Sequence, residues 1–284
     1  MQGWLSGLFR LGVLLPSVAS VEELQELLAD VSTLGQRDLT AVWRQAEGLD
    51  SQALRQYFMS ATPDIVEQYA TVSGLASAEF YDAQLPDSPF RAVPAAPPPL
   101  AQVEGSTSWA LSALYRDTLT SPLTLFSGSL QRMIFQTSRE TIVGSVRMEP
   151  GATYARYASA NACSFCRMLA TRGAVYSTKG SAGLVGADRW EIKRNGKGQK
   201  VGGSIGRTAS ARGNEKTGQK SGDKFHDNCR CMAVCVRPGQ SYEPPDYVNK
   251  WEQDYIAAVK ATPGTGEYGA IDTKAVLNHM RSNN

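Results

Sequence analysis

The first 162 of the chain's 284 residues contain neither cysteine nor histidine. The whole chain has only five cysteines and two histidines, so the side chains that most often bind zinc are confined to its rear part. Long apolar runs are also missing: no stretch approaches about 18 uncharged apolar residues, which excludes a predicted membrane-spanning helix. The 42% apolar composition is ordinary for a soluble globular protein of two domains.

The N-terminal stretch from Trp4 to Leu15 is apolar, but it lacks a basic region before it and is interrupted by Arg10. It is therefore a poor export signal and too short to cross a bilayer. We expect an amphipathic segment that docks on a partner. We also expect a soluble, intracellular protein.

Two clusters hold four of the five cysteines: Cys163-Ser-Phe-Cys166, and His226-Asp-Asn-Cys229-Arg-Cys231. Two thiols separated by two residues can bind one metal ion from a tight turn, and the second cluster can complete a tetrahedral site. The pattern predicts a structural Zn²⁺ site. Five candidates compete for four positions, so His226 or one of Cys229 and Cys231 is expected to lie outside the first coordination sphere.

Other interpretations of the thiols stay open at this point. Disulfides between the clusters, a redox Cys-x-x-Cys pair and a nucleophilic cysteine are the alternatives. Cys235 lies in the apolar run Met232–Val236 and is expected to be a buried structural cysteine.

The charges are distributed unevenly. Residues 1–100 carry five Arg, no Lys and twelve acidic residues, whereas residues 151–240 carry sixteen basic and five acidic residues. Ten of those bases fall between Asp188 and Lys224. This segment can contact the phosphates of DNA without sequence preference, or it can be a merely solvated loop.

Helical patterns dominate the front half. Ser20-Val-Glu-Glu23 is typical of a capping box, and a second helix is expected from near Asp38 to Met59. Thr62-Pro63-Asp64 predicts the start of a third helix, and two more are expected at about 106–119 and 122–146.

The predicted fold class is mainly α: an N-terminal helical bundle plus a small α+β, zinc-knuckle-like C-terminal module with a long flexible basic insertion. Within the module we expect a helix near 165–171 and strands at 174–177 and 229–236. The predicted divisions are a helical region at 1–84, a Pro-rich linker or strap at 85–105, a helical hairpin at 106–150, the module at 151–240 with its insertion at 179–224, and a helical tail at 241–284.

The chain resembles the MuF-like minor head proteins of tailed bacteriophages, particularly those of actinobacterial phages. The resemblance rests on the segments Ala162–Tyr176 and Phe225–Cys231, with the Ala-Glu-Phe-Tyr-Asp stretch at Ala78–Asp82. It implies a minor capsid protein in head morphogenesis, located inside the virion near the portal and in the host cytoplasm during assembly. The implied partners are the portal, the major capsid protein or a scaffolding protein.

Proteins of this type are often labelled capsid maturation proteases, and this is the alternative function. The chain departs from the family pattern at Thr171-Arg-Gly and at Asp227, where many members have an Asp-Gly step and a Pro. A protease would need His226 or His279 as its base, and no Gly-x-Ser-x-Gly signature supports one. A zinc deaminase would need a His-x-Glu motif that the chain lacks. The sequence therefore favours a structural protein over an enzyme.

Overall fold

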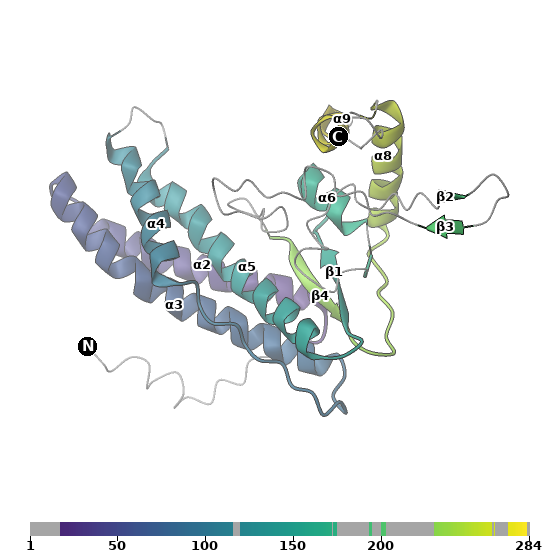
Figure 1. Ribbon diagram of the computed structural model, residues 1–284. Coiled ribbons are helices and arrows are strands. Elements are labelled where there is room, and N and C mark those ends of the chain that lie inside the picture. Colours follow the sequence, from purple (N-terminus) through teal and green to yellow (C-terminus); the bar gives the residue numbers. More distant parts are fainter. Residues whose placement is uncertain are drawn as a thin grey trace. The chain divides into compact units, whose positions relative to one another are not determined.

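The computed structural model describes residues 18–115, 120–171, 173–174, 230–262, 264 and 272–282, and the backbone of 193–194 and 200–202. Across these residues the protein is mainly helical, with two small two-stranded sheets (Figure 1). The chain forms two compact units. The first unit comprises Met1–Glu149 and Asp227–Met232, and the second comprises Pro150–His226 and Ala233–Asn284.

The first helix of the first unit, α2, spans Val21–Gln45 and begins where the sequence predicts. The Ser20 side chain accepts from the Glu23 backbone N–H, and the Glu23 carboxylate accepts from the Ser20 N–H. Hydrogen bonds from the Ser20 and Ala19 backbone lower the pKa of Glu23. This reciprocal pair satisfies donors that a helix N-terminus otherwise leaves open, and it confirms the capping box.

The expected second helix from Asp38 is wrong, because α2 continues through Asp38 to Gln45. The chain turns only after it, at Gly48, whose φ of 89° suits glycine. The next helix, α3, begins after Asp50, whose side chain accepts from the backbone N–H groups of Gln52 and Ala53. The Asp50 side chain therefore caps a helix that begins later than the sequence pattern predicts.

The expected helix start at Thr62-Pro63-Asp64 is also wrong, since α3 runs unbroken over Ser51–Ala83 with Pro63 inside it. The Thr62 hydroxyl does not cap a helix. It is fully buried and shares a 2.9 Å hydrogen bond with the Thr107 hydroxyl. Packing on both sides of Pro63 therefore keeps the helix continuous where a local signal favours an interruption.

Residues 84–99 form an extended Pro-rich strap that is fastened to the helices. The Ala92 N–H donates to the Asp82 carboxylate and the Ala95 N–H donates to the Thr141 hydroxyl, each at 2.9 Å. Gly74 makes room for the strap, since a Cβ there would lie 3.2 Å from the Ala95 carbonyl oxygen. The prolines are compatible with either a free linker or a strap, and these hydrogen bonds show a strap.

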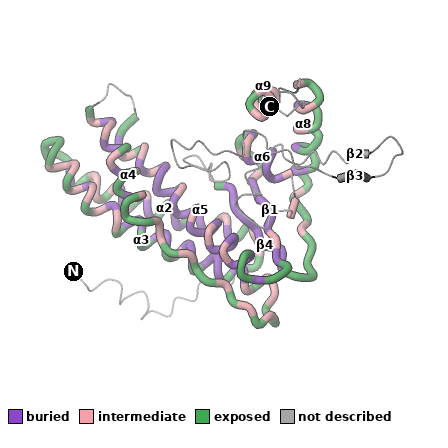
Figure 2. The backbone as a smooth tube through the Cα atoms, viewed as in Figure 1, coloured by how far each residue is buried: buried purple, intermediate pink, exposed green. Residues whose placement is uncertain are grey.

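The strap leads into α4 (Leu100–Leu111) and the short 3-10 helix η1 (Ser112–Tyr115), earlier than the expected start at 106. Helix α5 (Pro122–Met148) then follows, capped by Ser121 and starting with a proline. The buried residues follow the inner faces of these helices (Figure 2). Hydroxyls join the apolar side chains in this core: Ser73 donates to the Ile134 carbonyl, and Ser77 to Ser138.

The second unit is built from shorter elements. Strands β1 (Thr153–Tyr157) and β4 (Met232–Val236) pair, and helices α6 (Ser164–Ala170), α8 (Tyr247–Ala261) and α9 (Thr273–Ser282) pack together. Strands β2 (Lys193–Arg194) and β3 (Lys200–Gly202) pair antiparallel within the basic insertion. The helix near 165–171 is confirmed, and the strand expected at 229–236 is observed from Met232. The strand expected at 174–177 lies outside the described residues except for residue 174.

Candidate metal centre

The first predicted pair of ligands lies at the start of α6. Cys163 is the residue immediately before the helix, with φ −66° and ψ 157°, and Cys166 is the third helical residue. The Arg167 N–H donates to the Cys163 carbonyl at 3.0 Å, which closes the first helical turn between the two thiols. Side chains at these two positions of a helix start face each other. The backbone around the Cys-x-x-Cys pair therefore allows both thiols to bind one metal ion.

The two thiols differ in environment: Cys163 is exposed, and Cys166 is buried. Helix α6 is held firmly beneath them. Met168 packs with Ala258, Val276 and Met280, which come from α8 and α9. This core fixes the helix that carries both thiols.

A polar and aromatic arrangement holds the turn before α6. The Arg167 Nε donates to the Ala162 carbonyl at 2.7 Å, and its guanidinium lies 5.5 Å from the centre of the Trp251 ring. The Trp251 ring packs at a tilt against Tyr247, whose hydroxyl donates to the Ala158 carbonyl. These contacts leave little freedom for the turn that ends at Cys163.

The described part of the second cluster is anchored to the helical bundle. The Arg230 carbonyl accepts from Gln25 Nε2 of α2 at 2.9 Å, and the Cys231 carbonyl accepts from Arg139 Nη1 of α5 at 2.8 Å. Cys231 is 5% exposed and Arg139 is 4% exposed. The bundle thus fixes the backbone of one candidate ligand through a charged, buried donor.

Sequence patterns gave no sign of Gln25 as a positioning residue. The only signal for Arg139 was a charged residue among the apolar positions of a core helix. Its target is 92 residues away in the chain, and that of Gln25 is 205 residues away.

His226 and Cys229, the other two candidate ligands, lie outside the described residues. Cys163 and Cys166 belong to the second unit and Cys231 to the first. Among the residues that the structure describes, no three His, Cys, Asp or Glu side chains form a group able to hold a metal ion. Closure of the predicted site by the two clusters therefore stays a prediction.

Two further residues considered at the sequence level are described. Cys235 is 5% exposed in β4, and its expected burial is confirmed. His279, named above as a possible base for a protease, lies on α9, two of whose side chains are buried in the core.

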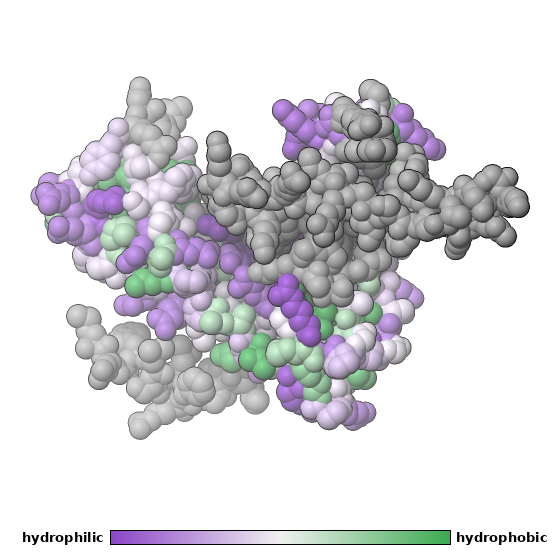
Figure 3. Space-filling view, in the orientation of Figure 1, coloured by the Kyte–Doolittle hydropathy of each residue, from purple (hydrophilic) through white to green (hydrophobic). Residues whose placement is uncertain are grey.

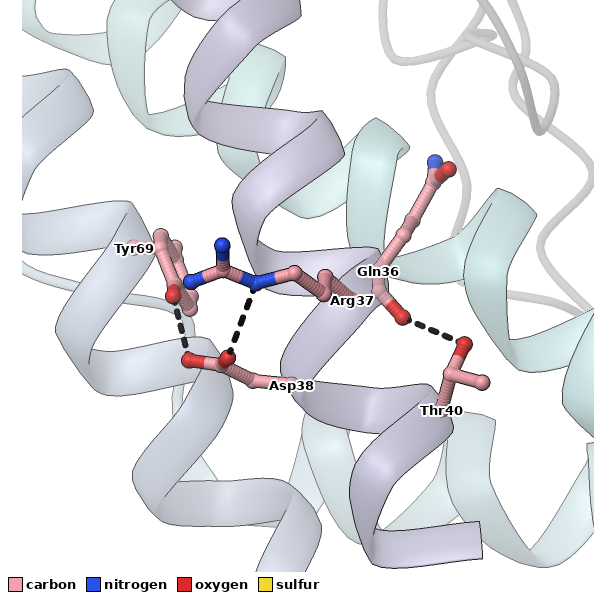
Figure 4. Close-up of polar contacts among 5 residues, drawn as sticks. All are labelled: Gln36, Arg37, Asp38, Thr40 and Tyr69. Carbon is pink, nitrogen blue, oxygen red and sulfur yellow. Dashed lines mark hydrogen bonds and ion pairs between the residues drawn. The ribbon is translucent and has the colours of Figure 1, made fainter. Parts of the chain in front are cut away.

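The first unit contains a separate polar contact between α2 and α3 (Figure 4). The Tyr69 hydroxyl donates to the Asp38 carboxylate, which also lies 3.8 Å from Arg37 Nε. Burial, followed by the hydrogen bond to Asp38, raises the pKa of Tyr69 well above its ordinary value of about 10. This contact is one polar link between the two helices.

Comparison with known proteins places these elements in a family context. A model of the family described as VG15 protein matches residues 16–258, which includes parts of both units and all five candidate ligands. No curated protein and no solved structure matches the chain. Within the described residues no helix is both long enough and apolar enough to cross a membrane.

Proposed function

The chain belongs to the VG15 protein family and is phage-associated, and from this premise we propose that it is a minor capsid protein of the MuF-like type that acts in procapsid assembly near the portal. The observation that supports the phage association is the family match over residues 16–258, and the finer assignment rests on the resemblance of Ala162–Tyr176 and Phe225–Cys231 to MuF-like proteins. The character of the two units supports a role as an assembly protein rather than an enzyme.

The first unit is suited to binding another protein. Three helices of 25, 33 and 27 residues pack around a shared core, and the strap fastens α4 to them. Large apolar side chains remain exposed on it, including Trp109 at 44% and Tyr115 at 64%. Exposed aromatic residues of this kind are common in protein–protein interfaces. The portal, the major capsid protein or a scaffolding protein is the proposed partner.

The second unit is proposed to be stabilised by one structural Zn²⁺ ion. Cys163 and Cys166 would supply two ligands, and two of His226, Cys229 and Cys231 the other two. The turn geometry at α6 and the anchored Cys231 carbonyl support this choice. A site filled by protein ligands holds the chain and leaves no position for a reacting water. The Lys and Arg side chains of the second unit between residues 188 and 224 are proposed to contact the phosphates of packaged DNA.

Co-assembly tests the proposal directly. The protein would be coexpressed with the portal and major capsid protein of the phage that encodes it, and particles would be separated on a gradient. We expect the chain to sediment with procapsids that contain portal and to be lost from shells that lack it. Equal association with both shells, or with neither, would contradict a portal-proximal role.

The protease alternative is examined in the same system. His226→Ala and Cys166→Ala would be followed for cleavage of the head proteins and for zinc content. A structural site predicts that both variants lose zinc and soluble protein together. A variant that stays folded and metal-bound but no longer cleaves head proteins would establish the enzyme instead.

A further inference from the structure

Helix α4 and η1 carry little charge for a segment at the surface of the first unit. Across residues 100–115, Glu104 is the only charged residue. One side of α4 is buried, and the other side is open: Ala101, Gly105 and Trp109 are exposed, Trp109 at 44%. Figure 3 shows mostly pale surface over α4. A surface that contains Trp and little charge is typical of the centre of a protein–protein interface.

The open side of α4 has both a projection and a hollow. Ala101, Gly105 and Trp109 follow one another at intervals of four residues, which places them along one face of the helix. A Cβ added at Gly105 would meet nothing within 4 Å, so the helix backbone is uncovered there. The large Trp109 side chain stands one turn further on. A face that carries both shapes can be complementary to a copy of itself.

The flank of α4 that borders α3 carries one charge of each sign. Arg55 of α3 is half-buried, and its Nη2 donates to the Ser108 hydroxyl at 2.9 Å. This bond holds the guanidinium against α4, one turn beyond the exposed carboxylate of Glu104. Within the described residues, neither Arg55 nor Glu104 has an ion-pair partner. A neighbour with an acid and a base at matching levels would neutralise both charges.

A second copy of the chain matches both the shape and the charges in one orientation. Two α4 helices can pack antiparallel about a twofold axis, with Trp109 of each copy against Gly105 of the other, and this symmetry brings equal flanks together. The level of Glu104 then lies two residues, or about 3 Å, from the other copy's Ser108, where Arg55 is held. A parallel pair would instead place Trp109 against Trp109 and Glu104 against Glu104.

We propose that the protein forms a twofold dimer through antiparallel α4 helices. Trp109 of each copy covers the Gly105 backbone of the other, and Glu104 of each copy pairs with Arg55 of the other. Because a copy of the same face supplies both members of each contact, the occupant is a second copy of this chain. One pair of 12-residue helices is smaller than a standard interface of about 1,600 Å², so the dissociation constant lies in the micromolar range.

The dimer goes beyond the proposed function and does not depend on it, since it concerns contact between copies of the chain. It covers Trp109 and leaves other exposed apolar side chains of the unit, such as Leu34 and Leu75, for contact with a head protein. Its test uses the purified full-length chain alone. A failure of the dimer and a failure of portal association are therefore distinguishable.

Complementary charge reversals test the dimer by analytical ultracentrifugation. The wild type should show a monomer–dimer equilibrium as its concentration rises through the micromolar range. Glu104→Arg alone and Arg55→Glu alone should each raise the dissociation constant at least about tenfold, because each places like charges together on both sides of the twofold axis. An equimolar mixture of the two variants should recover the dimer, because every positive charge then faces a negative one.

Two further variants supply the controls. Arg44→Glu reverses an exposed charge on α2 and should dimerise like the wild type. Gly105→Leu fills the hollow at a position with open space around it, so it should keep the fold and lose the dimer. Circular dichroism checks the helices, and if Arg55→Glu does not fold, Glu104→Arg and Gly105→Leu still decide. A monomeric wild type, a dimer that survives Gly105→Leu, or a mixture of folded charge variants that stays monomeric would overturn the proposal.

Discussion

The two units obtain their stability from different sources. The first unit contains helices of 25, 33 and 27 residues, and its fully buried side chains include Phe58, Phe80, Phe126 and Phe135. The second unit has helices of 7, 15 and 10 residues, and the described core that joins them has two methionines, Met168 and Met280, among its four buried residues. Methionine fills space adaptably but specifies a packing poorly. Shorter helices joined by such adaptable side chains would gain more from a metal ion or another cross-link than the long helices of the first unit.

The largest expected effect is loss of the second unit when metal is removed. Purified protein should contain one Zn²⁺ per chain, and a chelator should raise hydrogen exchange in β1, α6 and α8 while leaving α2, α3 and α5 protected. Structural zinc can contribute roughly 10 kcal/mol to folding, which is more than the small core can replace. Mass spectrometry of the metal and of exchanged peptides measures both quantities.

Cysteine variants distinguish the loss of zinc binding from the loss of any buried thiol. Cys163→Ser and Cys166→Ser should abolish zinc binding, whereas Cys235→Ala, which removes a buried thiol outside the predicted ligand set, should retain it. Zinc-free wild-type protein with full protection in α6 would show that the second unit needs no metal.

Arg139→Met is expected to have the next largest effect, because it removes the buried donor to the Cys231 carbonyl. A hydrogen bond from a charged group contributes about 2–3 kcal/mol, so the first unit should lose that much stability. If Cys231 is a zinc ligand, zinc affinity should also fall about tenfold.

Denaturant unfolding and competitive zinc titration are the measurements for Arg139→Met. Arg132→Met, which affects a half-buried arginine of the same helix, is the matched control. An unchanged zinc affinity in Arg139→Met would mean that the bundle plays no part in positioning the second cluster.

Glycine substitutions examine how tightly the first unit is packed. In Gly35→Ala the new Cβ would lie 3.0 Å from the Tyr69 ring, so we expect a loss of about 2 kcal/mol. Gly144→Ala meets nothing within 4 Å and should stabilise its helix by about 0.5–1 kcal/mol. Thermal unfolding of both variants gives the comparison, and equal shifts would indicate a loosely packed α2–α3 contact.

The smallest expected loss of stability is that of Tyr69→Phe, about 1 kcal/mol at neutral pH for one partly buried hydrogen bond. Because the pKa of Tyr69 is raised in the folded protein, its contribution is fully present below pH 10 and is lost as pH rises above that value. Wild-type stability should therefore fall more steeply than that of the variant above pH 10. Parallel curves in urea titrations at several pH values would contradict this.

Sequence patterns correctly predicted those helix starts of the first unit that depend on residues adjacent in the sequence. The capping box at Ser20 and the Ser121-Pro122 helix start are two examples. The same kind of signal failed at Thr62, where a buried hydrogen bond to Thr107 outweighs the local preference. A residue 45 positions away decides that outcome, and no pattern around Thr62 reports it.

The candidate metal site also has features that the sequence predicts and features that depend on tertiary packing. The Cys163–Cys166 spacing predicted a turn, and the structure has both residues around the first turn of α6. The anchoring of Cys231 by Arg139 depends on the tertiary packing of α5 and could not be read from the spacing of cysteines. Whether the two clusters share one ion remains a prediction.

The fastened strap has a mechanical consequence. A slack tether between α3 and α4 would let each helix respond separately to a load, but the bonds from Ala92 to Asp82 and from Ala95 to Thr141 remove that slack. Tension applied to α4 by a neighbouring subunit would pass directly into α3 and α5. A load on α4 would thus be shared with α3 and α5 instead of being absorbed by the strap.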